Sequence, residues 1–170
     1  QNPIEYEGTY PLPEAQLDRF LMKVLVPYPS RDTEIQMLHH HAQGFNPNLL
    51  ELSGIQAIGG EEIFMGLRDQ NAQIRVSSQI EAYLADLLIA SRNHELVLLG
   101  ASPRAGVALL QTARTVAGLE GRDYVVPDDL KEILPSVWRH RLILRPEAEI
   151  EGISPDRVLA EVAERVPVPR

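Results

Sequence analysis

The segment Ser78–Arg92 constrains the fold most strongly, because its apolar residues recur at the spacing of one helix face. They follow the i, i+3, i+4, i+7, i+8 pattern: Ile80, Tyr83, Leu84, Leu87 and Leu88. Such a stripe predicts an amphipathic helix whose apolar side must be buried. Ser78 and Glu81 stand three residues apart, as in a capping box, and predict that the helix begins at Ser78.

Other helix starts are predicted from capping serines, from proline at the first helical position and from acids in the first turn. They are Ser30 before residues 31–42, Glu61 before a short helix over 61–68, Ser102 before Pro103, Pro127, and Ser154 before Pro155. Pro135 is expected to kink its helix or end it early. Together these signals predict about seven helices and only one or two strands. The fold class is therefore mainly α.

One strand is predicted over residues 21–26, which are rich in strand formers and stop at Pro27. A turn cluster at 44–48, with glycine, proline and two asparagines, is a candidate boundary between two parts of the chain. On this basis we expect one part to cover residues 1–44 and a second, helical part to cover residues 45–170.

Composition excludes several classes of protein. The 170 residues are 44% hydrophobic and 24% charged, as in ordinary globular proteins, and no run approaches the roughly 18 apolar residues of a membrane span. With no cysteine, the chain has neither disulfides nor thiolate chemistry, which suits the cytoplasm. A formal charge of -8 argues against nucleic-acid binding, although the helix-turn-helix spacing around Ser102 leaves DNA recognition as a weak alternative.

The first twenty residues contain three prolines and one glycine, which predict a loop with mostly fixed φ angles. The loop leads into a short helix near Pro13 and Glu14 that is expected to carry Leu17 and Phe20 inward. Arg19 is left at the far end of that helix. A surface ion pair with Asp18 or Glu14 is the simplest interpretation of Arg19 from the residues alone.

A second candidate site is the run Gly-Ala-Ser-Pro-Arg-Ala at residues 100–105. Ser102 is a suitable N-cap and Pro103 a suitable first helical residue. Arg104 is then expected to project from the first helical turn, beside backbone amides that favour anions. A plain surface arginine is the alternative.

These stretches, together with Gly-Arg-Asp-Tyr-Val-Val-Pro-Asp-Asp-Leu at residues 121–130, resemble the MoxR branch of the AAA+ ATPases. The resemblance implies a helical AAA+ lid domain at 45–170 and a remnant of the α/β core at 1–44. It implies that Asn2 is sensor 1, that Arg19 is the arginine finger, and that Arg104 is sensor 2. For Asn2, a plain turn residue before Pro3 is the alternative.

Phosphoryl transfer explains why the family uses such groups. Cleavage of a γ-phosphate needs a positioned water and charge stabilisation more than covalent chemistry. An amide such as that of Asn2 can orient the water, and a planar guanidinium such as that of Arg19 can neutralise phosphate oxygens of a neighbouring subunit.

The chain lacks the phosphate-binding loop of such enzymes. Its only lysines are Lys23 and Lys131, and neither follows a glycine as a Walker A lysine does. No apolar strand ends in the Asp-Glu pair of a Walker B motif. We therefore expect the chain to be a C-terminal part of a longer ATPase, and to be inactive in ATP hydrolysis by itself.

The resemblance also implies the setting of that longer ATPase: ATP and Mg²⁺ as cofactors, a homo-oligomeric ring, typically a hexamer, and a von Willebrand factor A domain protein as partner. The implied function is chaperone-like remodelling of proteins. A stand-alone helical adaptor without nucleotide chemistry is the alternative. No metal site is expected, because the adjacent residues His39, His40 and His41 point about 100° apart on a helix. For His140, packing at a helix end is favoured over catalysis.

Overall fold

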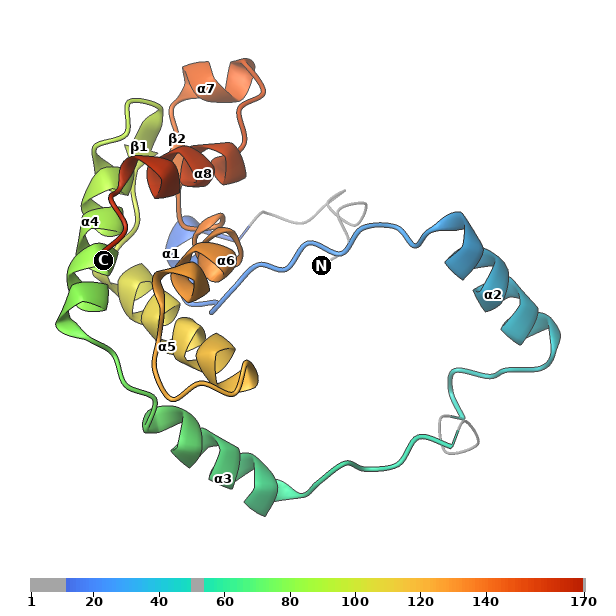
Figure 1. Ribbon diagram of the computed structural model, residues 1–170. Helices are drawn as coiled ribbons and strands as arrows, with labels where there is room; N and C mark the ends of the chain where they lie inside the picture. The colour runs from blue at the N-terminus through green and yellow to red at the C-terminus, as the bar shows by residue number, and fades with distance from the viewer. Residues whose placement is uncertain (1–11, 50–53, 170) are drawn as a thin grey trace. The chain divides into compact units, whose positions relative to one another are not determined.

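A computed structural model describes residues 12–49 and 54–169, and Asn2 therefore lies outside the described residues. The chain divides into two units (Figure 1). The first contains the residues up to Val24 and those from Gln70 onward, and the second is Leu25–Asp69. The predicted division at residue 44 stays a prediction.

The first unit is built mainly of helices. Its elements are α1 (Glu14–Leu17), α4 (Ser78–Arg92), β1 (Val97–Leu99), α5 (Pro103–Leu119), α6 (Pro127–Trp138), β2 (Ile143–Leu144), α7 (Pro146–Ile150) and α8 (Pro155–Arg165). α5 packs chiefly against α6, while α4 and α6 both contact α8. β1 and β2 pair antiparallel, with Val97 opposite Leu144. The mainly helical fold class is confirmed.

The core of this unit lies where α4, α5, α6 and α8 meet. Fully buried side chains come from each of these helices: Leu87, Leu109, Leu134, Trp138 and Leu159. Removing this apolar surface from water is the main stabilising term for helices of such length. Burial of Ile80, Tyr83, Leu84 and Leu87 confirms the face predicted from the α4 sequence, whereas Leu88 is only partly buried.

The helix starts follow the predicted capping chemistry. The Ser102 hydroxyl accepts a hydrogen bond from the amide of Ala105 at 3.2 Å, and that of Ser154 accepts from Arg157 at 3.3 Å. Both helices carry proline in the first turn. α4 begins at Ser78 as predicted, but its N-cap is Ser77, which keeps an extended backbone and accepts from the Ile80 amide at 3.3 Å.

The second unit contains α2 (Arg31–Ala42) and most of α3 (Glu61–Ala72), whose last three residues belong to the first unit. Ser30 caps α2 as predicted, accepting from the Thr33 amide at 3.3 Å. α2 has no buried residue.

The strand expected at 21–26 and the inward Phe20 are wrong, and so is an early end of α6 at Pro135, while a kink there stays a prediction. Residues 21–26 form no strand, because a strand needs a neighbouring strand for its hydrogen bonds. The Lys23 amide instead donates to the Ser136 carbonyl at 2.8 Å. Pro135 does not end α6, which continues to Trp138. Phe20, expected to point inward, is 56% exposed.

The predicted motif at 121–130 has a structural explanation. Arg122 binds the Asp129 carboxylate with two hydrogen bonds of 2.8 and 2.5 Å, and Asp129 also accepts from the Val126 amide at 2.8 Å. Asp129 thus caps the start of α6, where an anion is favourable. The nearby Asp129 also raises the pKa of Arg122, mainly through this hydrogen bonding.

Candidate functional site

Arg19 lies in the turn that follows α1, and its side chain is exposed. The turn is closed by backbone hydrogen bonds from Arg19 to Gln16 and from Phe20 to Leu17, at 3.2 and 3.1 Å. Among the described side chains, none forms an ion pair with Arg19. The carboxylate of Asp18 pairs with Arg104 and Arg141 instead, so the expected pair of Arg19 with Asp18 does not form. The alternative partner, the Glu14 side chain, lies outside what the structure describes.

Arg104 projects from the first turn of α5, as the sequence predicts. Its Nη1 lies 3.4 Å from Oδ2 of Asp18, and the Arg104 side chain is 62% exposed. Exposed ion pairs of this kind contribute about 0–1 kcal/mol. The guanidinium of Arg104 is therefore accessible and only weakly held.

Arg141 is the opposite case, a guanidinium that is only 2% exposed. Its Nε donates to Oδ1 of Asp18 at 3.0 Å. Its Nη2 donates to the carbonyls of Phe20 at 2.7 Å and Asp18 at 3.2 Å. Its Nη1 donates to the carbonyls of Leu21, at 3.1 Å, and of Val137. Burial lowers the pKa of Arg141, and the hydrogen bond and charge of Asp18 oppose that effect.

We call residues 138–141 the α6 end, and these side chains tie it to other segments of the chain. The Trp138 indole donates to the Ala105 carbonyl at 3.0 Å. Arg139 donates to the Asp156 carboxylate at 2.9 Å and to the Lys23 carbonyl at 3.2 Å. The α6 end thus joins the start of α5, the start of α8 and the chain that follows Arg19.

His140 belongs to the same group. Its Nε2 lies 3.1 Å from the Phe20 carbonyl oxygen and donates to it, because a carbonyl can only accept. Burial lowers the pKa of His140, and the charges of Arg141 and Lys23 add to the effect. Nδ1 has no partner among the described residues. This packing role at a helix end is the one that the sequence favoured.

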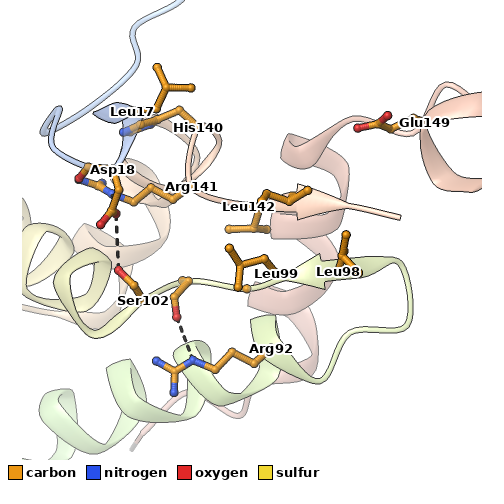
Figure 2. Close-up of a pocket in the computed structure, with 13 residues that line it drawn as sticks. Leu17, Asp18, Arg92, Leu98, Leu99, Ser102, His140, Arg141, Leu142 and Glu149 are labelled. Atoms are coloured by element: carbon orange, nitrogen blue, oxygen red, sulfur yellow. Dashed lines mark hydrogen bonds and ion pairs between the residues drawn. The ribbon is translucent and has the colours of Figure 1, made fainter. Parts of the chain in front are cut away.

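An open pocket of about 760 Å³ lies between the turn after α1, the β1–β2 pair and α7. Figure 2 shows Asp18 beside Arg141 and reaching toward Ser102, whose hydroxyl is 3.5 Å from Oδ1 of Asp18. Arg92, at another wall, donates to the Ala101 carbonyl at 2.9 Å. The pocket borders the Asp18 contacts, but neither Arg19 nor Arg104 lines it.

Comparison with known proteins assigns this arrangement to a family. Residues 89–162 match the AAA lid domain, and residues 1–22 match the ATPase family associated with various cellular activities (AAA). Chaperone MoxR1 of Mycobacterium tuberculosis is 38% identical over 179 residues, which take in 100% of this chain and 46% of MoxR1. The chain belongs to the MoxR family of AAA ATPases.

Two further relatives agree with this assignment. YeaC of Bacillus subtilis is 40% identical over 169 residues, covering 99% of this chain and 51% of YeaC. The crystal structure of a putative ATPase from Cytophaga hutchinsonii superposes with a TM-score of 0.89 at 34% identity, covering 100% of this chain and 53% of that one. The MoxR-family chain therefore spans about half the length of the relatives it matches.

Of the three site residues predicted for the MoxR family, Arg19 and Arg104 lie in the described part. The Asp18 carboxylate contacts Arg104, whereas Arg19 follows Asp18 in the chain and does not pair with it. Asn2 lies outside that part. Sequence reasoning missed Arg141 and the role of Asp18, because no spacing signals a contact between residues 123 positions apart.

Two negative findings apply to residues 12–49 and 54–169 only. No helix there is both long and apolar enough to cross a membrane. No group of three or more histidine, aspartate, glutamate or cysteine side chains is placed to hold a metal ion.

Proposed function

We propose that this part of the MoxR-family ATPase supplies the arginines that stabilise the charge that develops on ATP during hydrolysis. Arg19 acts as the arginine finger on the nucleotide of the next subunit, and Arg104 acts as sensor 2 of the lid. The observation that carries the proposal is the contrast around Asp18. One arginine, Arg141, is buried and fully hydrogen-bonded, whereas Arg19 and Arg104 are exposed.

The donor set at Arg104 fits a phosphate group. Its guanidinium projects from the first turn of α5, where free backbone amides and the helix dipole favour an anion. It is held by one 3.4 Å contact to Asp18, which a phosphate oxygen can replace at little cost. Bound Mg²⁺–ATP would supply the anhydride bond that is broken, and Arg104 would orient and neutralise the outer phosphate.

Arg19 suits action on a neighbouring subunit. It is exposed at the tip of a turn, and none of the described side chains pairs with it. A guanidinium remains charged at every physiological pH and binds two oxygens at once. Such a group stabilises the transition state when it is presented to a nucleotide from outside.

The wider setting is part of the proposal. Asn2 would orient the attacking water, and the active form would be a cytoplasmic homo-oligomeric ring, typically a hexamer, with ATP and Mg²⁺ bound. The ring would remodel protein partners as a chaperone, with a von Willebrand factor A domain protein as one partner. The name of MoxR1, a chaperone, supports this function.

The test is the substitution Arg19→Ala in the full-length protein. Loss of an arginine finger costs about 10³ to 10⁵ in turnover, so we expect ATP binding to persist and hydrolysis to fall by that range. Arg157→Ala is the matched control, because the Arg157 side chain is 67% exposed and pairs only with Glu161 among the described side chains. Wild-type turnover in Arg19→Ala would refute the assignment of Arg19.

Arg104→Ala tests the sensor separately. We expect a lower turnover and a weaker response of the protein to the γ-phosphate, measured as the ratio of ATP to ADP affinity. If the full-length protein binds no nucleotide at all, and no Gly-x-x-x-x-Gly-Lys-Ser/Thr loop precedes this part within about a hundred residues, the adaptor function would be favoured instead.

A further inference from the structure

Arg141 holds the turn that carries Arg19, although it lies about 120 positions further along the chain. Four of its five hydrogen bonds go to residues 18–21, and the fifth goes to Val137 within α6. Every nitrogen of the guanidinium therefore has a partner. A buried cation is tolerated when its hydrogen bonds are complete. Removing one partner would leave the buried charge of Arg141 uncompensated and weaken the whole contact.

Neighbouring contacts fix the same segment to the lid helices. His140 donates to the Phe20 carbonyl, the Lys23 amide donates to Ser136, and Arg139 donates to the Lys23 carbonyl. The segment 18–23 is thus bound along its length to the end of α6. It has no strand partner in the part of the chain that the structure describes.

We call the contact of Arg141 with residues 18–21 the anchor. Asp18 connects the anchor to the start of α5. Its Oδ1 lies 3.0 Å from Nε of Arg141, and its Oδ2 lies 3.4 Å from Nη1 of Arg104. The first contact is partly buried and the second is exposed. A phosphate that takes Arg104 away from Asp18 therefore leaves the Arg141 contact in place.

We propose that Arg141 is a positioning residue that, through Asp18 and the carbonyls of residues 18–21, makes the Arg19 turn move with the lid as one body. The inference rests on the proposed function of Arg19. It adds that nucleotide binding at Arg104 moves the lid, and that this movement displaces Arg19, the arginine finger that acts on the next subunit. Communication between subunits would then depend on Arg141, which touches no nucleotide itself.

The test measures the distance between the turn and the lid in the full-length protein. Spin labels are placed by Gln16→Cys in α1 and Asp86→Cys in α4, both of which are exposed. The 170 residues contain no cysteine, so only cysteines outside them need replacing in the full-length protein. We expect one narrow distance distribution, unchanged when Mg²⁺ and a non-hydrolysable ATP analogue are added.

Two variants then break the anchor by different routes. Asp18→Asn removes the carboxylate charge, and Arg141→Lys keeps the charge but loses the planar fork that reaches the carboxylate and the carbonyls together. Both should broaden the distribution or add a second peak. Asp123→Asn and Arg157→Lys are the controls, since both residues lie in exposed ion pairs, and neither should change the distances.

Kinetics supply the second readout. In both anchor variants we expect kcat for ATP hydrolysis to fall by about tenfold or more, with KM changed by less than about threefold, because positioning of the finger affects the transition state and not binding. Turnover of Arg141→Lys should be higher than that of Arg141→Ala. If Arg141→Lys does not fold, Asp18→Asn carries the test alone.

The outcomes separate this inference from the proposed function. Folded variants with unchanged distances would overturn the anchor even where Arg19→Ala is inactive. A wild-type label pair that splits into two distances on adding nucleotide would overturn it as well. Wild-type turnover in Arg19→Ala would refute the finger, while the label distances would still report whether Arg141 holds the turn.

Discussion

The Trp138 indole donates a hydrogen bond of 3.0 Å to the carbonyl of Ala105, the residue that follows Arg104. Both residues are fully buried. The contact fixes the end of α6 against the first turn of α5, and it thereby sets where Arg104 leaves the lid. Core packing and the candidate site are linked at this point.

Trp138→Phe should destabilise the lid, because it removes the hydrogen bond and leaves unfilled space in the core. We expect a loss of about 1–3 kcal/mol in the free energy of opening. Hydrogen exchange of the α5 and α6 amides in the full-length protein measures it. A loss below about 0.5 kcal/mol would show that the contact is not needed.

Gly100→Ala should also destabilise the lid, for a steric reason. A Cβ at Gly100 would lie 2.6 Å from Cα of Arg92, so that backbone would have to move. We expect a cost of about 1–3 kcal/mol, seen as faster exchange of amides at the end of α4.

Gly66→Ala provides the matched control. A Cβ at Gly66 meets nothing within 4 Å, and the residue lies inside α3. There the same substitution should stabilise its helix by about 0.4–1 kcal/mol. Equal effects at the two glycines would contradict the packing that the structure gives Gly100.

His140 should make the lid less stable in acid. Its folded-state pKa is lowered, chiefly by burial, with Arg141 and Lys23 adding to the effect while the Phe20 carbonyl and Asp18 oppose it. The unfolded chain therefore binds a proton at a higher pH than the folded chain does. Stability is full above the unfolded pKa of about 6.5 and falls as the pH drops toward the lowered folded value.

His140→Gln should flatten this pH dependence, since glutamine can still donate to the Phe20 carbonyl and does not titrate. The measurement is the opening free energy of the α6 amides between about pH 7.5 and 5. His40→Gln, on exposed α2, serves as the control. An unchanged slope in His140→Gln would exclude this histidine as the source.

Asp129→Asn should weaken the start of α6 more than Asp123→Asn weakens its own surroundings. The Asp129 side chain is 4% exposed and accepts three hydrogen bonds, whereas Asp123 is 75% exposed and pairs with Arg75. Breaking a buried ion pair costs more stability than breaking an exposed one. The difference in thermal midpoint between the two variants checks the ranking.

Local signals alone determined much of this protein. The apolar stripe of α4, the serine caps at Ser102 and Ser154, and the prolines that follow them depend only on residues within a few positions, so the sequence predicts them directly. The position of Arg104 on the first turn of α5 follows from the Ser102 cap. The short helix before Arg19 was also predicted locally, although Arg19 itself lies in the turn after α1.

Only the tertiary structure decided what surrounds those arginines. Asp18 and Arg141 meet across 123 positions, and Trp138 reaches Ala105 across 33. Such contacts depend on how helices pack, which no local spacing encodes. The strand predicted at 21–26 failed for the same reason, because strand propensity has an effect only where another strand supplies hydrogen bonds, and here α6 supplies one to Lys23 instead.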